Sequence, residues 1–284
     1  MTQYTRPLSL SDALALLARE PRQVLAGGTD IYPATSGREI AGPVLDIALL
    51  PELRGIGADG AGLRIGACTT WAEIARAELP PGLRALQQAA LEVGGRQIQN
   101  AGTIGGNLCN ASPAADGVPP LLAVGAEVEL ASARGRRRLD LGAFITGPRQ
   151  TLRAADEVLV AVHIPAEGLA GASRFLKLGA RAYLVISIAM VAVRLEMAQG
   201  RVRQAALAVG SCSAVARRLP GVEAALVGVP AGDAALRIGD AAVAAALAPL
   251  DDLRATASYR AGAAAELLRR AVGELAGELT GETA

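Results

Sequence analysis

The sequence is poor in the residues that most often build metal and catalytic centres. It has one histidine, His163, and three cysteines, Cys68, Cys109 and Cys212, which show no CxxC spacing. This pattern argues against a zinc site or an iron–sulfur cluster held by this chain alone, and we expect no metal ligands in it. Without a disulfide framework, a reducing cytoplasm is the expected compartment. We interpret Cys109 as a packing residue and His163 as structural or solvent-facing, and we predict no catalytic residue.

The chain also lacks a strong net charge and a long apolar run. The net charge is +1 and the isoelectric point is near 7.7. No global field therefore attracts nucleic acid or an anionic membrane. The longest apolar run, residues 183–193, is shorter than the ~20 residues needed to span a bilayer, and Asp12 interrupts the first apolar stretch. We expect no membrane insertion and no signal peptide, and we place the basic run Arg134–Arg138 in a solvated turn.

Lysine is almost absent, although arginine is common. Of 28 basic residues, 27 are arginine and one, Lys177, is lysine. An ammonium group is a compact point charge, whereas a guanidinium group is a broad planar fork. This contrast makes Lys177 a candidate for a site that requires a compact cation.

The strongest motif is a pair of glycine-rich segments about 75 residues apart. The first consists of Ala26, Gly27, Gly28, Thr29 and Asp30, and the second of Thr103, Ile104, Gly105, Gly106 and Asn107. Glycine allows successive backbone N–H groups to approach phosphate oxygens, and the two threonines add hydroxyl donors. Neither segment has the GxGxxG or GxxxxGK[ST] pattern. We predict two loops that close from two sides on one extended, phosphate-bearing ligand.

Hydrophobic periodicity and turn residues predict an α+β chain in which strands cluster. Thr70 and Glu73 have the spacing of a capping box, so a helix should begin at Thr70. Residues 197–200 fit a hairpin turn, and a domain boundary is expected near residue 170. The predicted strands cover residues 23–26, 43–47, 63–67, 121–130, 158–164, 174–178, 186–196 and 202–209, and the predicted helices cover residues 9–19, 81–93, 221–227, 241–247 and 259–275.

These motifs resemble those of a known family. The first glycine segment, followed by Thr103–Asn107 and its continuation through Ser112 to Asp116, is similar to the FAD-binding medium subunit of molybdenum hydroxylases. This family includes carbon monoxide dehydrogenase medium subunits and xanthine dehydrogenase flavin subunits. The resemblance implies a vanillyl-alcohol-oxidase-type (PCMH) FAD-binding fold with two α+β subdomains over residues 1–170. It also implies a small α+β C-terminal domain over residues 171–284, with a sheet covered by helices.

The resemblance implies FAD as the cofactor and a role for each matching residue. The backbone N–H groups of Ala26–Asp30 and Thr103–Asn107 would surround the pyrophosphate. Ser112 and Asp116 would lie by the ribityl and ribose groups, and Leu159 would meet the isoalloxazine through its backbone. Lys177 would lie near the flavin ring, where a cation would raise the reduction potential.

The resemblance implies an electron-transfer subunit and not a complete enzyme. Substrate would be oxidised at molybdopterin on a large subunit, and electrons would pass through [2Fe–2S] clusters of a small subunit to FAD and then to an external acceptor. A heterotrimer, or a dimer of heterotrimers, is the implied assembly. Two alternatives remain open at this point: a standalone FAD-dependent reductase on the same fold, and a non-enzymatic nucleotide-binding scaffold. FAD binding could also require the partner subunits.

Overall fold

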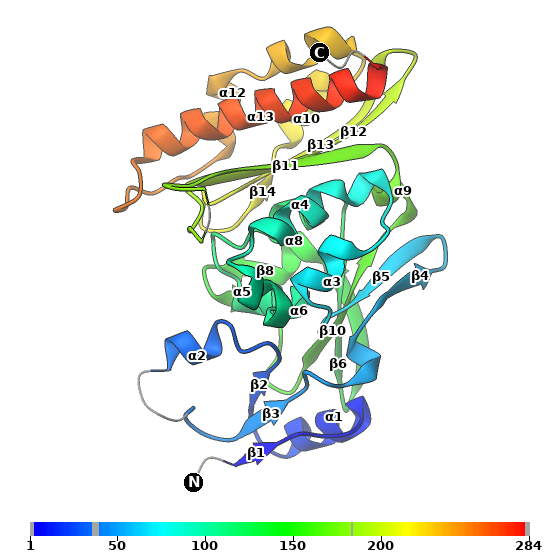
Figure 1. Cartoon of the computed structure of the whole chain (residues 1–284), viewed down its shortest axis with the longest axis vertical. Helices are drawn as coiled ribbons and strands as arrows, with labels where there is room; N and C mark the ends of the chain where they lie inside the picture. The colour runs from blue at the N-terminus through cyan, green and yellow to red at the C-terminus, as the bar shows by residue number, and fades with distance from the viewer. Residues whose placement is uncertain (1–2, 36–39, 183, 282–284) are drawn as a thin grey trace.

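The N-terminal part begins with a small parallel sheet and one amphipathic helix. The computed structural model describes residues 3–35, 40–182 and 184–281. Strands β1 (Tyr4–Thr5), β3 (Val44–Asp46) and β2 (Gln23–Leu25) lie side by side in that order. Helix α1 (Leu10–Arg19) begins at the predicted position because the side chain of Ser9 caps its first turn. Its buried apolar residues belong to the same cluster as Leu45 of β3, and the helix lies beside the strands of this sheet at the base of Figure 1.

A five-stranded antiparallel sheet forms the centre of the N-terminal part. Its strand order is β4-β5-β10-β6-β7, and every residue of the central strand β10 (Val158–Ile164) is buried. Short helices cover one face of this sheet (Figure 1). The predicted capping box at Thr70 and Glu73 is present and begins α3. The other strands are β4 (Ile56–Asp59), β5 (Gly62–Gly66), β6 (Glu127–Ser132) and β7 (Gly135–Asp140), and the helical elements are α2 (Ile31–Ala34), η1 (Pro51–Leu53), α3 (Trp71–Arg76), η2 (Pro81–Leu83), α4 (Arg84–Glu92), α5 (Arg96–Ala101), α6 (Ile104–Asn110), α7 (Val118–Ala123) and α8 (Leu141–Phe144).

The C-terminal part is a four-stranded antiparallel sheet with its own helices on one face. Its strands are β11 (Ala172–Leu178), β12 (Ala189–Ala198), β13 (Arg201–Gly210) and β14 (Arg217–Arg218), in chain order. Helices α10 (Pro220–Leu226), α12 (Asp240–Ala246) and α13 (Ala257–Thr280) cover one face (Figure 1). The short helix α9 (Ala166–Leu169) lies between β10 and β11, and α11 (Ala231–Ala234) and η3 (Ala235–Arg237) lie between α10 and α12. The predicted hairpin is confirmed, because Gln199 and Gly200 both have positive φ in a two-residue turn.

The opposite face of this sheet packs on the N-terminal part. A shared apolar cluster joins α4 and α7 to the sheet, with Phe175 and Met190 as its largest side chains. Hydrogen bonds reinforce the contact: the amide of Ala85 donates to Ser173 Oγ at 2.8 Å, and the amide of Phe175 donates to Gln88 Oε1 at 2.8 Å. The two parts therefore share one continuous packed interface. The α+β class is as predicted, and the predicted division near residue 170 falls between β10 and β11.

Three sequence-based predictions of local structure are wrong. The apolar run 121–130 was expected to be a strand but is divided between α7 and β6, because Pro119 and Pro120 suit the first turn of a helix. The second glycine segment was expected to be a loop, but its residues begin helix α6 with Thr103 as N-cap. Most of the basic run Arg134–Arg138 lies in strand β7 and pairs with carboxylates, not in a turn.

Candidate functional site

The main candidate site is a cleft of about 670 Å³ in the N-terminal part. This volume is within the roughly 300–1,000 Å³ typical of sites for small organic ligands. Its walls come from β2, the two glycine-rich segments, the connection from β8 (Ile145–Gly147) and β9 (Gln150–Thr151) to β10, and residues 184–186. In Figure 1, β2 and α2 lie on one side of this region and α5 and α6 on the other.

Almost all of the predicted site residues converge on this cleft. Ile104 and Lys177 are the two that do not line it: Ile104 is fully buried at the start of α6, and Lys177 lies behind the wall. The residues that line the cleft are Ala26, Gly27, Gly28, Thr29, Asp30, Thr103, Gly105, Gly106, Asn107, Ser112, Asp116 and Leu159.

The first glycine segment forms an amide cradle, by which we mean residues 27–30. Among the described residues, none accepts a hydrogen bond from the four backbone N–H groups of this cradle. Gly28 has a φ of +71°, which favours glycine. A Cβ on Gly27 would lie 1.8 Å from the carbonyl oxygen of Ala101, so the cradle rests directly on the end of α5. Four unpaired donors beside a cleft are suited to an anionic ligand.

The second glycine segment differs from the prediction of a matching amide cradle. The amide of Ile104 donates to the carbonyl of Thr69 at 3.0 Å, and that of Gly105 donates to the carbonyl of Ala67 at 2.8 Å. The amide of Gly106 donates to Thr103 Oγ1 at 3.1 Å. These three N–H groups therefore already have acceptors within the protein, which corrects the expectation that both segments offer free amides.

Asn107 gives the second segment a different polar group at the cleft. Its side-chain oxygen Oδ1 is buried and has no hydrogen-bond partner among the described residues. A buried acceptor without a donor costs free energy, which a ligand hydroxyl or N–H group would recover. The second segment therefore offers an acceptor where the first offers donors.

The end of the cleft near the C-terminal sheet contains a buried ion pair. Asp116 Oδ2 accepts from Lys177 Nζ at 2.8 Å, and Asp116 Oδ1 accepts from Ser187 Oγ at 2.8 Å. Lys177 also donates to the carbonyl of Glu92 at 3.3 Å. Burial raises the pKa of Asp116, and the bonds from Lys177 and Ser187 oppose this rise. Lys177 thus holds Asp116 at the wall, and its charge is matched by that carboxylate.

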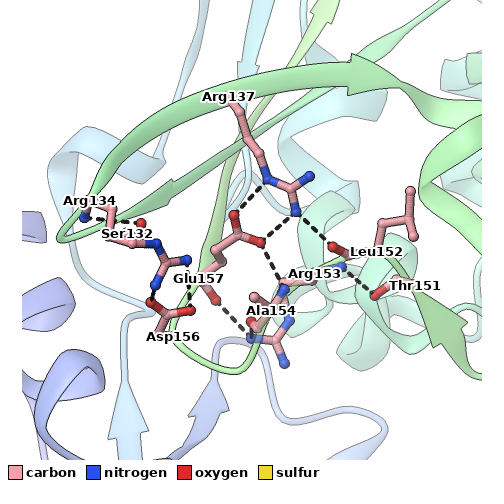
Figure 2. A network of polar contacts seen from close by, with 9 residues as sticks. All are labelled: Ser132, Arg134, Arg137, Thr151, Leu152, Arg153, Ala154, Asp156 and Glu157. Carbon is pink, nitrogen blue, oxygen red and sulfur yellow. Dashed lines mark hydrogen bonds and ion pairs between the residues drawn. The ribbon is translucent and has the colours of Figure 1, made fainter.

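A second polar network shapes the wall that leads into β10 (Figure 2). Arg137 donates to both oxygens of Glu157, at 2.7 and 2.8 Å, and to the carbonyl of Leu152 at 2.7 Å. Glu157 also accepts from the amide of Ala154, and its own carbonyl accepts from Arg153 Nη1 at 2.7 Å. The bond from Arg137 is the main reason that the pKa of Glu157 is lowered. Because both carboxylate oxygens and the carbonyl of Glu157 accept hydrogen bonds, Glu157 fixes the turn that places Leu159 at the cleft.

Sequence reasoning missed several residues that line the cleft. Three arginines, Arg22, Arg149 and Arg153, belong to the wall, as do Cys68 and Cys109. Burial raises the pKa of Cys68 to about 12 and that of Cys109 to about 11, which disfavours the reactive thiolate. The only signal for the arginines was their position next to glycine, proline or a turn, which by itself does not separate a cleft residue from a surface residue.

Comparisons with known proteins match both parts of the chain. The family model for the FAD-binding domain in molybdopterin dehydrogenases matches residues 1–167, and the CO dehydrogenase flavoprotein C-terminal domain matches residues 174–275. The chain belongs to the family of FAD-binding medium subunits of molybdenum hydroxylases. The resemblance seen in the sequence is therefore confirmed.

Individual relatives of this medium-subunit family cover nearly the whole chain. The nicotine 6-hydroxylase medium subunit of Paenarthrobacter nicotinovorans is 32% identical over 96% of each chain. The carbon monoxide dehydrogenase medium chain of Hydrogenophaga pseudoflava is 30% identical over 95% of each. Among solved structures, reconstituted CO dehydrogenase from Oligotropha carboxidovorans superposes with a TM-score of 0.90 at 29% identity, covering 98% of both chains.

The residues at the cleft fit the FAD that this family binds. The amide cradle suits a diphosphate, and the unpaired oxygen of Asn107 suits a hydroxyl or N–H group of the ligand. The described residues contain no group of three or more histidine, cysteine, aspartate or glutamate side chains arranged to hold a metal. None of the helices in the described part of the chain is both long and apolar enough to cross a membrane.

Proposed function

We propose that this chain is the FAD-carrying electron-transfer subunit of a multi-subunit molybdenum hydroxylase. The observation that supports this most directly is the amide cradle of residues 27–30, which has four unpaired donors at one end of a cleft large enough for a dinucleotide. In this proposal the cradle binds the diphosphate, and the cleft wall aligns the rest of the cofactor. FAD would accept electrons from [2Fe–2S] clusters of a small subunit and pass them to an external acceptor.

Several of the predicted cofactor contacts have a physical reason in this proposal. Thr29, together with Thr103 in its N-cap position, places hydroxyl groups beside the diphosphate. Asp116 accepts hydrogen bonds from hydroxyl groups of the sugar chain, and Lys177 holds that carboxylate in place from behind. Leu159, at the irregular start of β10, offers its backbone to the ring system. Because electron transfer through a flavin needs no protein acid or base, the absence of a predicted catalytic residue is consistent with this role.

The assembly is also part of the proposal. Relatives of this chain are named medium subunits or medium chains, a term that implies smaller and larger partners. We propose a heterotrimer with an iron–sulfur subunit and a molybdopterin subunit, single or doubled. The cytoplasmic location remains a prediction from cysteine usage.

A visible spectrum of the purified full chain, alone and co-purified with its partners, tests this proposal. Flavin absorption that bleaches on addition of dithionite is expected, with one FAD released per chain on denaturation. A chain that purifies with its partners and contains no flavin would refute it and favour a nucleotide-binding scaffold. If the flavin of the chain alone, without any partner, turns over with a small-molecule substrate, the standalone reductase would be favoured.

A further inference from the structure

Arg149 occupies an unusual backbone position at the edge of the cleft. It lies with Pro148 in the two-residue turn between β8 and β9, and its φ is +61°. Proline suits the first central position of such a turn, and the second central position of a type II turn requires positive φ and is usually glycine. Arg149 is exposed, so packing of its side chain does not explain why arginine stands there.

A second residue with positive φ faces Arg149. Ala111, which ends α6, has a φ of +47°, and its carbonyl accepts from the amide of Arg149 at 2.8 Å. Positive φ is strained for residues other than glycine, and such residues cluster at functional sites. The pairing fixes the turn against the end of the helix that begins with the second glycine segment.

A chain of side-chain hydrogen bonds begins at this turn and joins residues that line the cleft. Arg149 Nη1 donates to Asn110 Oδ1, and Asn110 Nδ2 donates to Asp30 Oδ1 at 2.8 Å. The orientation of the Asn110 amide follows from chemistry, since arginine only donates and an ionised carboxylate only accepts. All three residues line the cleft, and Asp30 belongs to the amide cradle. The chain therefore ties three separate segments together around the place of the predicted diphosphate.

The charge of Arg149 has no counter-charge in direct contact. Across residues 3–35, 40–182 and 184–281, no carboxylate lies within ion-pair distance of Arg149, and its Nε and Nη2 atoms have no protein acceptor. By contrast, Arg134, Arg136 and Arg137 on the neighbouring hairpin each pair with a carboxylate. Asn110 separates Arg149 from the carboxylate of Asp30. The unused donors of Arg149 thus remain available to an anion in the cleft.

We infer that Arg149 is an anion-recognition residue that binds a phosphate of a dinucleotide in this cleft, with Asn110 as its positioning residue. The inference rests on the proposed function and adds a contact that the glycine motifs did not indicate. The phosphate could belong to FAD itself or to a nicotinamide dinucleotide that exchanges electrons with it. A planar guanidinium with two free nitrogen atoms can bind either phosphate in a bidentate manner.

The test compares Arg149→Gln with Arg237→Gln in the full chain, purified with any partners that accompany it. Arg237 is exposed in the C-terminal part, so its replacement removes the same charge far from the cleft. After removal of flavin, FAD and then riboflavin, which has no phosphate, are titrated by fluorescence quenching. If FAD is the source of the phosphate, Arg149→Gln should weaken FAD binding about three- to tenfold, as expected for a partly exposed charged contact. Riboflavin binding should not change.

Two further variants separate recognition from folding. Arg149→Gly removes the guanidinium but suits the positive φ, so it should leave the melting temperature unchanged or higher while weakening FAD binding to the same extent. Asn110→Ala should weaken FAD binding about threefold, because Arg149 keeps its charge but loses its orientation. The FAD affinity of Arg149→Gln should also depend less on salt concentration than that of the wild type.

The nicotinamide source is tested on flavin-loaded protein by the rate at which NADH reduces the flavin. A higher apparent Kd for NADH in Arg149→Gln, with unchanged FAD affinity, would support the inference and identify the second dinucleotide as the source of the phosphate. If neither FAD affinity nor NADH reduction differs from the Arg237→Gln control, the inference is wrong although the proposed function stands. A wild-type protein that binds no flavin would instead refute the proposed function and this inference with it.

Discussion

Replacing Gly27 with alanine should force the amide cradle away from α5. An added Cβ would lie 1.8 Å from the carbonyl oxygen of Ala101 and 2.5 Å from its carbon, whereas real Cβ contacts below 3.0 Å essentially never occur. The segments must therefore separate by about 1.2 Å. No flexible side chain can absorb the movement, because every close atom belongs to backbone.

The cost can be estimated from this geometry. Overpacking by one methyl group against a fixed backbone typically costs about 1–3 kcal/mol, which lowers the melting temperature of a chain of this size by about 2–10 °C. A displacement of this size also moves hydrogen-bond donors out of range of a diphosphate. We expect FAD affinity to fall at least tenfold, since a charged hydrogen bond contributes about 1.5–3 kcal/mol. Differential scanning fluorimetry and FAD titration measure the two effects.

Gly262→Ala is the matched control for this substitution. Gly262 lies within helix α13 with nothing within 4 Å of the added methyl group. Alanine there should stabilise the chain by about 1 kcal/mol and leave FAD binding unchanged. The reasoning is refuted if Gly27→Ala binds FAD with wild-type affinity, because the cradle would then not depend on its contact with α5.

Two further predictions concern buried charges. Lys177→Met should destabilise the chain by about 3 kcal/mol in urea unfolding at pH 7, because it leaves the carboxylate of Asp116 buried and unpaired; adding Asp116→Asn should recover part of the loss, and no recovery would contradict the pairing. The ring of His163 lies between two carboxylates, with Nδ1 2.6 Å from Asp59 Oδ2 and Nε2 2.7 Å from Glu129 Oε2. Burial raises the pKa of Glu129, but bonds from an arginine and His163 outweigh it, and the bond from His163 lowers the pKa of Asp59. Because both folded pKa values are depressed, this stabilisation is complete above about pH 4.5 and is lost as pH falls through the folded values. Urea unfolding as a function of pH should show that His163→Gln is less stable at pH 7 and that its free energy of unfolding falls less steeply at acid pH. If the free energy of unfolding of this variant falls at acid pH as steeply as that of the wild type, the network is not the cause of the fall.

Local patterns predicted most elements of the fold. The capping box at Thr70, the turn at Gln199–Gly200 and the long C-terminal helix all depend on residues close in sequence, so they could be read without a structure. The strand expected over residues 121–130 failed because an apolar run of this kind is compatible with both a helix and a strand. The two prolines before it were the signal that favoured a helical start.

The candidate site was only partly predictable. The glycine motifs located both segments, but sequence could not show that the amides of Gly105 and Gly106 are already bonded within the protein. Lys177 was expected near the flavin ring, but sequence could not show that it pairs with Asp116, a buried carboxylate that needs a cation within contact distance. Arg149 was missed because its significance depends on its backbone conformation and on Asn110, which is 39 residues away in the chain.

The apolar cluster shared by α4, α7 and the four-stranded sheet limits how the protein can be divided. A chain cut near residue 170 would leave Phe175 and Met190 exposed on one fragment and the small alanines of α4 exposed on the other. Neither fragment would have a partner for this surface, and both would tend to aggregate. The cleft wall contributed by residues 184–186 would also be lost from the N-terminal fragment. Any engineered transplant of this flavin site into another protein must therefore carry the C-terminal sheet with it.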